Sequence, residues 1–284
     1  MFFSKEEIML TDEQREKRKN GLGASDTSII MGYSTYKTPY QLYCEKTGAI
    51  DTEDEETELQ YWGNALESAV VKRFSDDNNV VVTFPDTLYH PDYDYIFANL
   101  DGWIASENSV LEIKCVNSFQ RKQWDLATKD GIPLNYLIQV AKQCVITNAS
   151  RGHVAVLIGG MEYKEFVYER DAALEELIIQ ADIDFWHCVK NGIEPDPINT
   201  SDCRMKFNES NPDKFAQTTF KTANALTKLT ETKQEIKRLN EIEEEYKVHL
   251  MSHMGNAEYL VGEEGEILVT WKANKKGTRV FNIK

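Results

Sequence analysis

The sequence has few cysteines, and their positions exclude the sites that cysteine usually builds. The five of them are odd in number, far apart and without a C-x-x-C pair: Cys44, Cys115, Cys144, Cys188 and Cys203. Zinc sites and disulfide frameworks both depend on closely or regularly spaced cysteines. We therefore expect no zinc site, and thiols that stay reduced in a cytosol.

Long apolar runs are missing as well. No stretch approaches the roughly 18 consecutive apolar residues of a membrane-spanning helix, and Met1–Glu7 lacks the shape of a signal peptide. These absences predict a cytoplasmic protein. Histidine is also scarce: only His249 and His253 stand four residues apart, and the charged stretch around them predicts a surface position.

Positive charge is in deficit, with 32 Lys and Arg against 47 Asp and Glu and a net charge of −15. This balance argues against a broad DNA-binding surface, because phosphate contacts demand Lys and Arg. The charge is unevenly spread, however. Residues 51–58 form a short acidic run typical of a solvated loop, whereas residues 101–152 contain six Lys or Arg and five Asp or Glu. A locally positive DNA path is therefore compatible with the sequence.

One pattern of charged residues stands out against these absences. Asp101 precedes the stretch Val110–Val116, in which Glu112 and Lys114 alternate with apolar residues. Alternation with a period of two predicts a strand that has Glu112 and Lys114 on one face. One interpretation is an ordinary ion pair on a surface strand. The other is a site where Asp101 and Glu112 bind Mg²⁺ or Mn²⁺, and Lys114 orients or activates a water molecule.

Two predicted helices supply further polar residues. The apolar spacing over residues 61–74 predicts an amphipathic helix with Glu67 beside its apolar stripe, where it can join the other two carboxylates. A second helix is predicted after Pro133, with Tyr136, Gln139 and Gln143 in one polar stripe. A solvated helix face is the alternative interpretation of Gln139.

These segments together resemble the YqaJ-type viral recombinase family. The lambda phage exonuclease is its best-known relative in fold, and both belong to the PD-(D/E)xK nuclease superfamily. The strict superfamily motif departs at Leu100, which stands where proline is often found. The matching segments keep the family's order between residue 18 and about residue 197, and they are Gly21–Asp26, Tyr33–Pro39, Trp62–Glu67, Asn99–Gly102, Leu111–Lys114, Pro133–Val140, Val156–Gly160, Glu169–Asp171 and Phe185–Trp186.

The resemblance implies roles for the residues at the catalytic centre. Glu67, Asp101 and Glu112 resemble the acidic metal ligands, and the backbone carbonyl of Ile113 resembles a further ligand. Lys114 resembles the catalytic lysine. The implied catalytic set is Lys114, Glu112, Asp101 and Gln139, with one or two Mg²⁺ ions, or Mn²⁺. The scattered cysteines argue against the iron–sulfur cluster that some related nucleases carry.

The resemblance also implies contacts to the substrate. Gln139 resembles a helix glutamine near the scissile phosphate, and Tyr136 on the same helix is expected to contact DNA. Arg18 and Ser25 resemble an arginine and a serine that hold a 5′-terminal phosphate. A guanidinium gives two parallel bonds to a phosphate, and a hydroxyl gives one more. Ser25 is also expected to cap a helix that starts at Asp26.

The implied fold class is α/β, with a restriction-endonuclease-like core in which helices flank a mixed central β-sheet. We expect this nuclease domain at residues 1–197, a linker at 198–213, and a long helix with a small β-hairpin at 214–284. The other expected helices and strands lie at 5–20, 80–84, 95–100, 110–116, 134–147, 153–158, 162–169 and 171–190. The C-terminal element is expected to pack or oligomerise; a DNA clamp through Lys272, Lys275, Lys276 and Arg279 is the alternative.

The implied activity is that of a Mg²⁺-dependent DNA exonuclease, which hydrolyses phosphodiester bonds of linear double-stranded DNA from 5′ to 3′ in phage-type recombination. Double-stranded DNA, a single-strand annealing protein and further copies of the chain, in a trimeric ring, are the implied partners. A phage-encoded protein would work in the cytoplasm of its bacterial host. An endonuclease or nickase with the same site, and a non-catalytic DNA-binding module on the same fold, remain as alternatives.

Overall fold

The computed structural model describes residues 17–50, 57–125 and 131–284. The chain forms two compact units, residues 1–209 and residues 210–284. The helix expected at 5–20 lies largely outside the described residues, of which 17–19 are helical. Within the described ranges, no helix is both long and apolar enough to cross a membrane.

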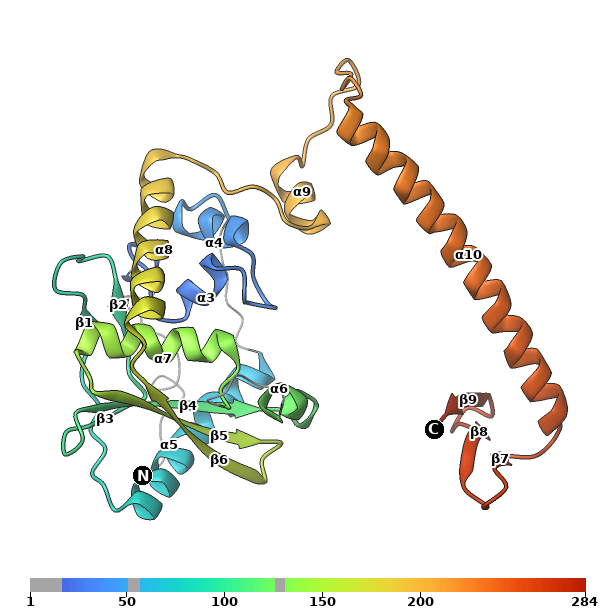
Figure 1. Ribbon diagram of the computed structural model, residues 1–284, viewed down its shortest axis with the longest axis horizontal. Helices are drawn as coiled ribbons and strands as arrows, with labels where there is room; N and C mark the ends of the chain where they lie inside the picture. The colour runs from blue at the N-terminus through green and yellow to red at the C-terminus, as the bar shows by residue number, and fades with distance from the viewer. Residues whose placement is uncertain (1–16, 51–56, 126–130) are drawn as a thin grey trace. The chain divides into compact units, whose positions relative to one another are not determined.

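The first unit is built on a four-stranded sheet in the order β3-β4-β5-β6 (Figure 1). These strands are β3 (Gly102–Ile104), β4 (Ser109–Val116), β5 (Arg151–Ile158) and β6 (Glu162–Glu169). Strands β4 and β5 run parallel, and the two outer pairs run antiparallel. The mixed sheet flanked by helices confirms the expected fold class.

Helices cover both faces of this sheet (Figure 1). The main ones are α5 (Glu58–Asn78) and α7 (Leu134–Thr147), and α8 (Ala172–Asn191) packs against α7. Val70 and Phe74 of α5 pack with Leu111 of β4, whereas α7 packs on the opposite face, where Val110 points. Gly152 permits the close approach of α7, because a Cβ atom there would lie 2.3 Å from a methyl group of Val140. Alternate residues of β4 therefore face different helices, as the sequence pattern predicts.

Shorter elements complete the first unit. They are α3 (Asp26–Ile30), α4 (Pro39–Lys46), β1 (Leu88–Tyr89), β2 (Phe97–Ala98), the 3₁₀-helix η1 (Ser118–Gln120), α6 (Arg121–Asp125) and α9 (Thr200–Lys206). Two expected strands are reduced here. Residues 80–84 make only an isolated bridge from Thr83 to Trp103, and of residues 95–100 only β2 forms, paired with β1. Val81 is 75% exposed, so a high β propensity has no effect where no partner strand is available.

The linker expected at 198–213 contains α9, which belongs to the first unit. The side chain of Asn199 caps this helix by accepting the Asp202 amide. The Asp202 carboxylate is fully buried and accepts hydrogen bonds from the Thr38 hydroxyl, at 2.9 Å, and from the Ile198 amide, at 3.1 Å. The prolines and polar residues of this stretch are typical of a linker. The sequence pattern does not show that one of its acids, Asp202, is buried. The boundary between the units follows residue 209.

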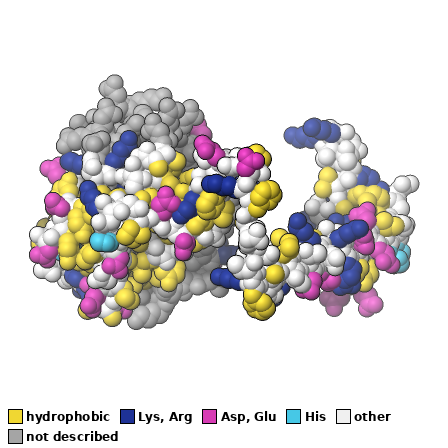
Figure 2. Space-filling model, turned by 90° about the horizontal axis from the view of Figure 1, so that it is seen from above, with side chains coloured by type: hydrophobic (Ala, Val, Ile, Leu, Met, Phe, Trp, Pro, Cys, Tyr) yellow, Lys and Arg dark blue, Asp and Glu magenta, His cyan; other side chains and the backbone are white. Residues whose placement is uncertain are grey.

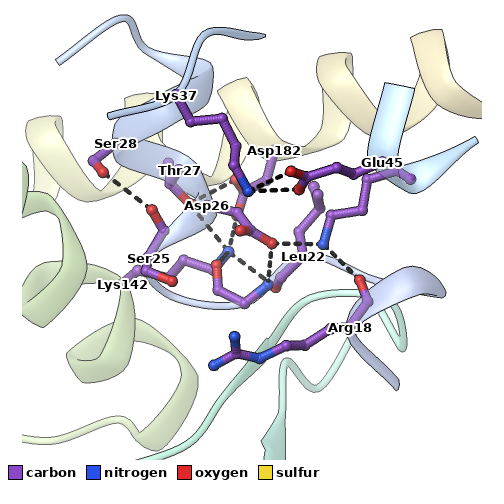
Figure 3. A network of polar contacts seen from close by, with 12 residues as sticks. Arg18, Leu22, Ser25, Asp26, Thr27, Ser28, Lys37, Glu45, Lys142 and Asp182 are labelled. Atoms are coloured by element: carbon purple, nitrogen blue, oxygen red, sulfur yellow. Dashed lines mark hydrogen bonds and ion pairs between the residues drawn. The ribbon is translucent and has the colours of Figure 1, made fainter. Parts of the chain in front are cut away.

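A buried ammonium group fastens α7 to α8 and to the N-terminal segment (Figure 3). Lys142 of α7 has no exposed surface, and its Nζ lies 2.6 Å from a carboxylate oxygen of Asp182 on α8. The same Nζ donates to the carbonyl oxygens of Leu22 and Gly23, at 3.1 and 2.9 Å, and to the Thr27 hydroxyl, at 3.0 Å. The Thr27 hydroxyl donates in turn to Asp182, at 2.7 Å. A buried charge is tolerated when its partners are this complete.

A second lysine holds the same N-terminal segment from α4. The Lys46 Nζ lies 2.8 Å from Asp26 and donates to the carbonyl oxygen of Arg18 at 2.5 Å. Burial alone would raise the pKa of Asp26, but the Lys46 ammonium outweighs it and holds that pKa below its ordinary value. Two lysines from two helices thus fix residues 18–27, the segment that carries Arg18 and Ser25.

The second unit consists of a long helix and a small sheet. Its elements are α10 (Phe220–Met254), β7 (Tyr259–Val261), β8 (Ile267–Ala273) and β9 (Arg279–Ile283). The three strands pair antiparallel in the order β7-β8-β9, so β7 adds one strand to the expected hairpin. Thr219 caps α10, which therefore begins later than residue 214.

Arg279 joins the sheet to the end of α10. Its guanidinium lies 3.6 Å above the Trp271 ring and donates to the carbonyl oxygens of Trp271, Gly255 and Ala257. These contacts satisfy the guanidinium within the unit. Arg279 therefore acts as a structural residue here, which weakens the alternative of a DNA clamp that includes it.

We predict that Lys142→Met destabilises the protein by about 3–5 kcal/mol, because it leaves the Asp182 carboxylate buried without a cation. Urea denaturation at pH 7 measures this change. Adding Asp182→Asn should restore part of the loss, whereas Lys72→Met should cost less than about 0.5 kcal/mol, since the Lys72–Asp76 pair is exposed. A single Lys142→Met variant as stable as wild type would contradict the structural role of this pair.

Candidate active site

A cavity of about 440 Å³ opens where β3 stops pairing with β4. Eight residues singled out from the sequence line it: Arg18, Ser25, Glu67, Asp101, Glu112, Ile113, Lys114 and Gln139. Tyr136 lies outside this cavity and borders a neighbouring one. The fold thus brings together residues that are up to 121 positions apart in the sequence, from Arg18 to Gln139.

The cavity exists because a strand ladder is interrupted. The pairing of β3 with β4 ends at Gly102, opposite Leu111. Beyond that point the amide of Ile113 donates to a carboxylate oxygen of Asp101, at 2.7 Å, instead of to a strand carbonyl. The amide and carbonyl of one strand residue point to the same side. The Ile113 carbonyl therefore faces the same open edge as Asp101, which is the position required of a backbone ligand.

Glu112 is the most enclosed of the carboxylates. Only 1% of its surface is exposed, and one oxygen contacts the Lys114 ammonium. The side-chain amides of Gln139 and Gln143 donate to its two oxygens, at 2.6 and 2.5 Å. One helix, α7, therefore fixes the orientation of this acid, and the Lys114 side chain, about a fifth exposed, keeps access to the cavity.

The three carboxylates repel one another in a site with little water. Burial and then repulsion by Glu67 raise the pKa of Asp101 to about 7. Burial and then repulsion by Asp101 raise the pKa of Glu112 to about 7, and burial raises the pKa of Glu67. Burial also opposes the charge on Lys114, but the two nearby acids hold its pKa above the ordinary value. The lysine is therefore a cation at neutral pH.

Glu67 and Asp101 both line the cavity, and the charge on Glu67 contributes to the raised pKa of Asp101. Over the ranges that the structure describes, no three His, Cys, Asp or Glu side chains are already arranged to hold a metal ion. The donor types nevertheless fit Mg²⁺ or Mn²⁺, because hard cations prefer carboxylate and carbonyl oxygens. A cation bound here would relieve the repulsion.

Arg18 and Ser25 lie on the wall formed by the N-terminal segment. Both are exposed, and both line the cavity. Ser25 occupies the N-cap position of α3, but its backbone is helical and its hydroxyl makes no capping bond, so the expected cap is wrong. Its neighbour Asp26 instead accepts a hydrogen bond from the Gly23 amide at 3.0 Å. The Ser25 hydroxyl is therefore not used to cap α3.

Three further polar residues belong to this site and have no role assigned from the sequence. Gln143 belongs to the predicted polar stripe, yet only the structure shows that it is buried and bonded to Glu112. Gln60 and Asn64, on the first turns of α5, also line the cavity. Gln60 stands seven residues and Asn64 three residues before Glu67, and this spacing is the signal that they share its helix face.

The face of the first unit seen in Figure 2 carries charges of both signs. In the view of Figure 2, Lys and Arg side chains lie among Asp and Glu over the described part of the first unit, and this face has no broad region of one sign. The basic groups that matter for the site are therefore individual ones. Arg18 and Lys114 are the two that line the cavity.

Comparisons with known proteins agree with this fold. Across 277 residues the chain is 29% identical to YqaJ of Bacillus subtilis (strain 168), covering 95% of this chain and 85% of that protein. The alkaline exonuclease LHK-Exo from Laribacter hongkongensis has a similar structure, with a TM-score of 0.54 and 23% identity over 64% of this chain and 94% of that one. That exonuclease has also been solved in complex with dAMP.

A proposed exonuclease from Eubacterium rectale gives a TM-score of 0.50 and 15% identity, over 73% of this chain and 96% of that one. At these identities the structural likenesses establish the fold alone. By sequence, residues 14–150 match the family model of the YqaJ-like viral recombinase domain. This range contains all nine residues assigned to the site from the sequence. The chain therefore contains a region, residues 14–150, that is similar to the YqaJ-like viral recombinase domain.

Proposed function

We propose that this protein is a metal-dependent deoxyribonuclease that degrades linear double-stranded DNA from its 5′ ends. One observation carries the proposal: Glu67, Asp101 and Glu112 lie in one cavity beside the charged amine of Lys114. Buried acids with raised pKa values next to a fixed cation are typical of catalytic sites. The YqaJ-like domain supports the same class of activity.

Each residue has a distinct part in phosphodiester hydrolysis. Glu67, Asp101 and the Ile113 carbonyl, together with Glu112, would hold the cation. A divalent cation in this position acidifies water and neutralises charge on a phosphate oxygen. Lys114 adds a fixed positive charge beside the reacting phosphate. Gln139, whose amide donates to Glu112 at 2.6 Å, keeps that carboxylate oriented and lines the cavity at the same point.

An exonuclease mode is favoured over an internal cut by the N-terminal wall of the cavity. Arg18 and Ser25 can bind a terminal 5′-phosphate there. The structural neighbour LHK-Exo is an alkaline exonuclease, and its complex with dAMP shows that it accommodates a nucleoside 5′-monophosphate. An endonuclease or nickase with the same acids is the second candidate, because the acids by themselves do not distinguish an end from the interior of a strand.

The proposal extends to location and partners. The nuclease would act in the cytoplasm, and its single-stranded product would pass to an annealing protein in phage-type recombination. A closed homo-oligomer, such as a trimeric ring, would retain DNA by topology, which suits an acidic chain. The half-exposed apolar side chains of α10, among them Leu229 and Ile236, offer a surface for such contacts. Light scattering tests this, because a monomeric mass would contradict it.

Digestion of plasmid DNA tests the proposed activity. With Mg²⁺, wild type should degrade linear plasmid and leave covalently closed circles intact. EDTA should abolish this activity, and Lys114→Ala should lower it by about 100-fold or more, because the reacting phosphate loses its fixed cation. Lys72→Ala, at an exposed lysine outside the acidic cavity, is the control. Cleavage of closed circles would favour the endonuclease, and no Lys114-dependent cleavage of either form would favour a binding module.

The phosphate-binding role of Arg18 is tested with matched DNA ends. Wild type should digest 5′-phosphorylated ends about tenfold faster than 5′-hydroxyl ends, since two charge-assisted bonds are lost with the phosphate. Arg18→Gln should slow only the phosphorylated substrate, whereas Lys19→Gln, at the exposed neighbouring residue, should leave both rates unchanged. Equal wild-type rates on the two kinds of end would exclude an end-reading pocket.

Removal of one carboxylate should stabilise the protein while it abolishes activity. A carboxyl whose pKa is higher in the folded than in the unfolded state lowers the stability of the fold at every pH where it is ionised in the unfolded chain. The destabilisation caused by Asp101 therefore grows between about pH 4 and pH 7. In EDTA at pH 8, Asp101→Asn should therefore raise the free energy of unfolding by on the order of 1 kcal/mol. At pH 5 the increase should be smaller. Denaturation curves at both pH values measure this, and a variant less stable than wild type at pH 8 would contradict the repulsion.

A further inference from the structure

A second cavity, of about 500 Å³, adjoins the acidic one and is lined by different residues. We call it the aromatic groove and define it by Tyr33, Tyr36, Tyr136, Gln120, Lys122 and Asn135. Tyr33 is 49% exposed and Tyr36 is 74% exposed. Aromatic rings this open to solvent are not needed to fill the core, so the groove is available to a ligand.

Tyr136 connects the aromatic groove to the candidate active site. The Lys114 Nζ lies 5.3 Å from the centre of its ring, and Trp124 stacks on that ring at 5.4 Å with the planes 17° apart. The ring is therefore held between a core tryptophan and the catalytic lysine. Tyr136 precedes Gln139 by three residues on α7, which is about 4.5 Å along the helix axis. That separation is on the order of one nucleotide step, about 3.4 Å in a B-form strand.

The groove has the composition of a surface for single-stranded nucleic acid. Tyrosine rings stack on the faces of unpaired bases, and the amides of Gln120 and Asn135 can donate to and accept from base edges. Lys122 supplies a charge for the phosphate backbone. The Gln120 amide also donates to the Tyr36 hydroxyl, at 3.0 Å, which holds that ring at the groove. Bases within a duplex stack on one another and do not offer their faces.

We propose that the aromatic groove binds unpaired bases of the DNA strand whose phosphodiester bond lies at the acidic centre, by stacking on Tyr36 and Tyr33. This inference rests on the proposed nuclease function, since it assumes that DNA occupies the adjoining cavity. Along α7 the order would then be the groove at Tyr136, the reacting phosphate at Gln139, and the anchored N-terminal segment at Lys142.

Binding of labelled oligodeoxythymidine to the full-length protein tests the proposal, with fluorescence anisotropy as the readout. The Glu112→Gln background removes cleavage, so that binding is measured by itself. Tyr36→Leu should weaken single-strand affinity about tenfold, the order expected for one stacked base, whereas Tyr36→Phe should change it less than twofold. Tyr246→Leu, at a tyrosine 65% exposed on α10, is the matched control and should have no effect. Tyr33→Leu provides a second variant with the same expected loss.

A second readout reports on stacking itself. An oligonucleotide that carries 2-aminopurine near its 5′ end should lose fluorescence on binding to the Glu112→Gln protein, and Tyr36→Leu should abolish that loss. The proposal that the aromatic groove binds unpaired bases would be contradicted if Tyr36→Leu weakened single-strand and blunt-duplex binding equally. It would also be contradicted if Tyr36→Leu weakened neither. Plasmid digestion separates the two proposals: retained nuclease activity with no effect at Tyr36 rejects only the groove, whereas a protein that neither cuts nor binds DNA rejects the nuclease function.

Discussion

The mutual repulsion of three carboxylates in a site with little water is the constraint around which the first unit is organised. Glu112 is 1% exposed, and its pKa, like that of Asp101, is raised to about 7. Such a cluster is unfavourable unless cations and donors compensate it. Lys114 and the two glutamines of α7 provide part of that compensation, and the interrupted β3–β4 ladder adds the Ile113 amide. The donor types fit a divalent cation, which we propose as the further partner.

One helix, α7, relates the parts of the site to each other. Gln139 and Gln143 orient Glu112, while Lys142, on the same helix, binds Asp182 and the carbonyl oxygens that precede Ser25. Tyr136 extends the helix contacts to Lys114. Any displacement of α7 would therefore move the acid, the N-terminal wall and the aromatic groove together. We interpret the buried ion pair as the feature that keeps these positions in register.

Local patterns carried most of the information that the sequence offers about this site. The alternation over 110–116 and the entry at Pro133 predict β4 and α7, because strand faces and helix starts are set by neighbouring residues. The burial of Lys142 was not predictable in this way, since its partner Leu22 lies 120 residues away. The same holds for Asp202 of α9, whose partner Thr38 is 164 residues distant. The short pairing around Thr83 likewise depends on which strands come near, not on its own β propensity.

Calorimetric titration of the full-length protein with Mn²⁺ tests the central claim most directly. The account predicts saturable binding to wild type, with protons released because the pKa values of Asp101 and Glu112, raised to about 7, leave these carboxyls partly protonated near neutral pH. Glu112→Gln should lose this binding while its unfolding transition stays cooperative. The absence of Mn²⁺ binding to wild type at millimolar concentrations, or equal binding by Glu112→Gln, would contradict the claim that these carboxylates form a cation site.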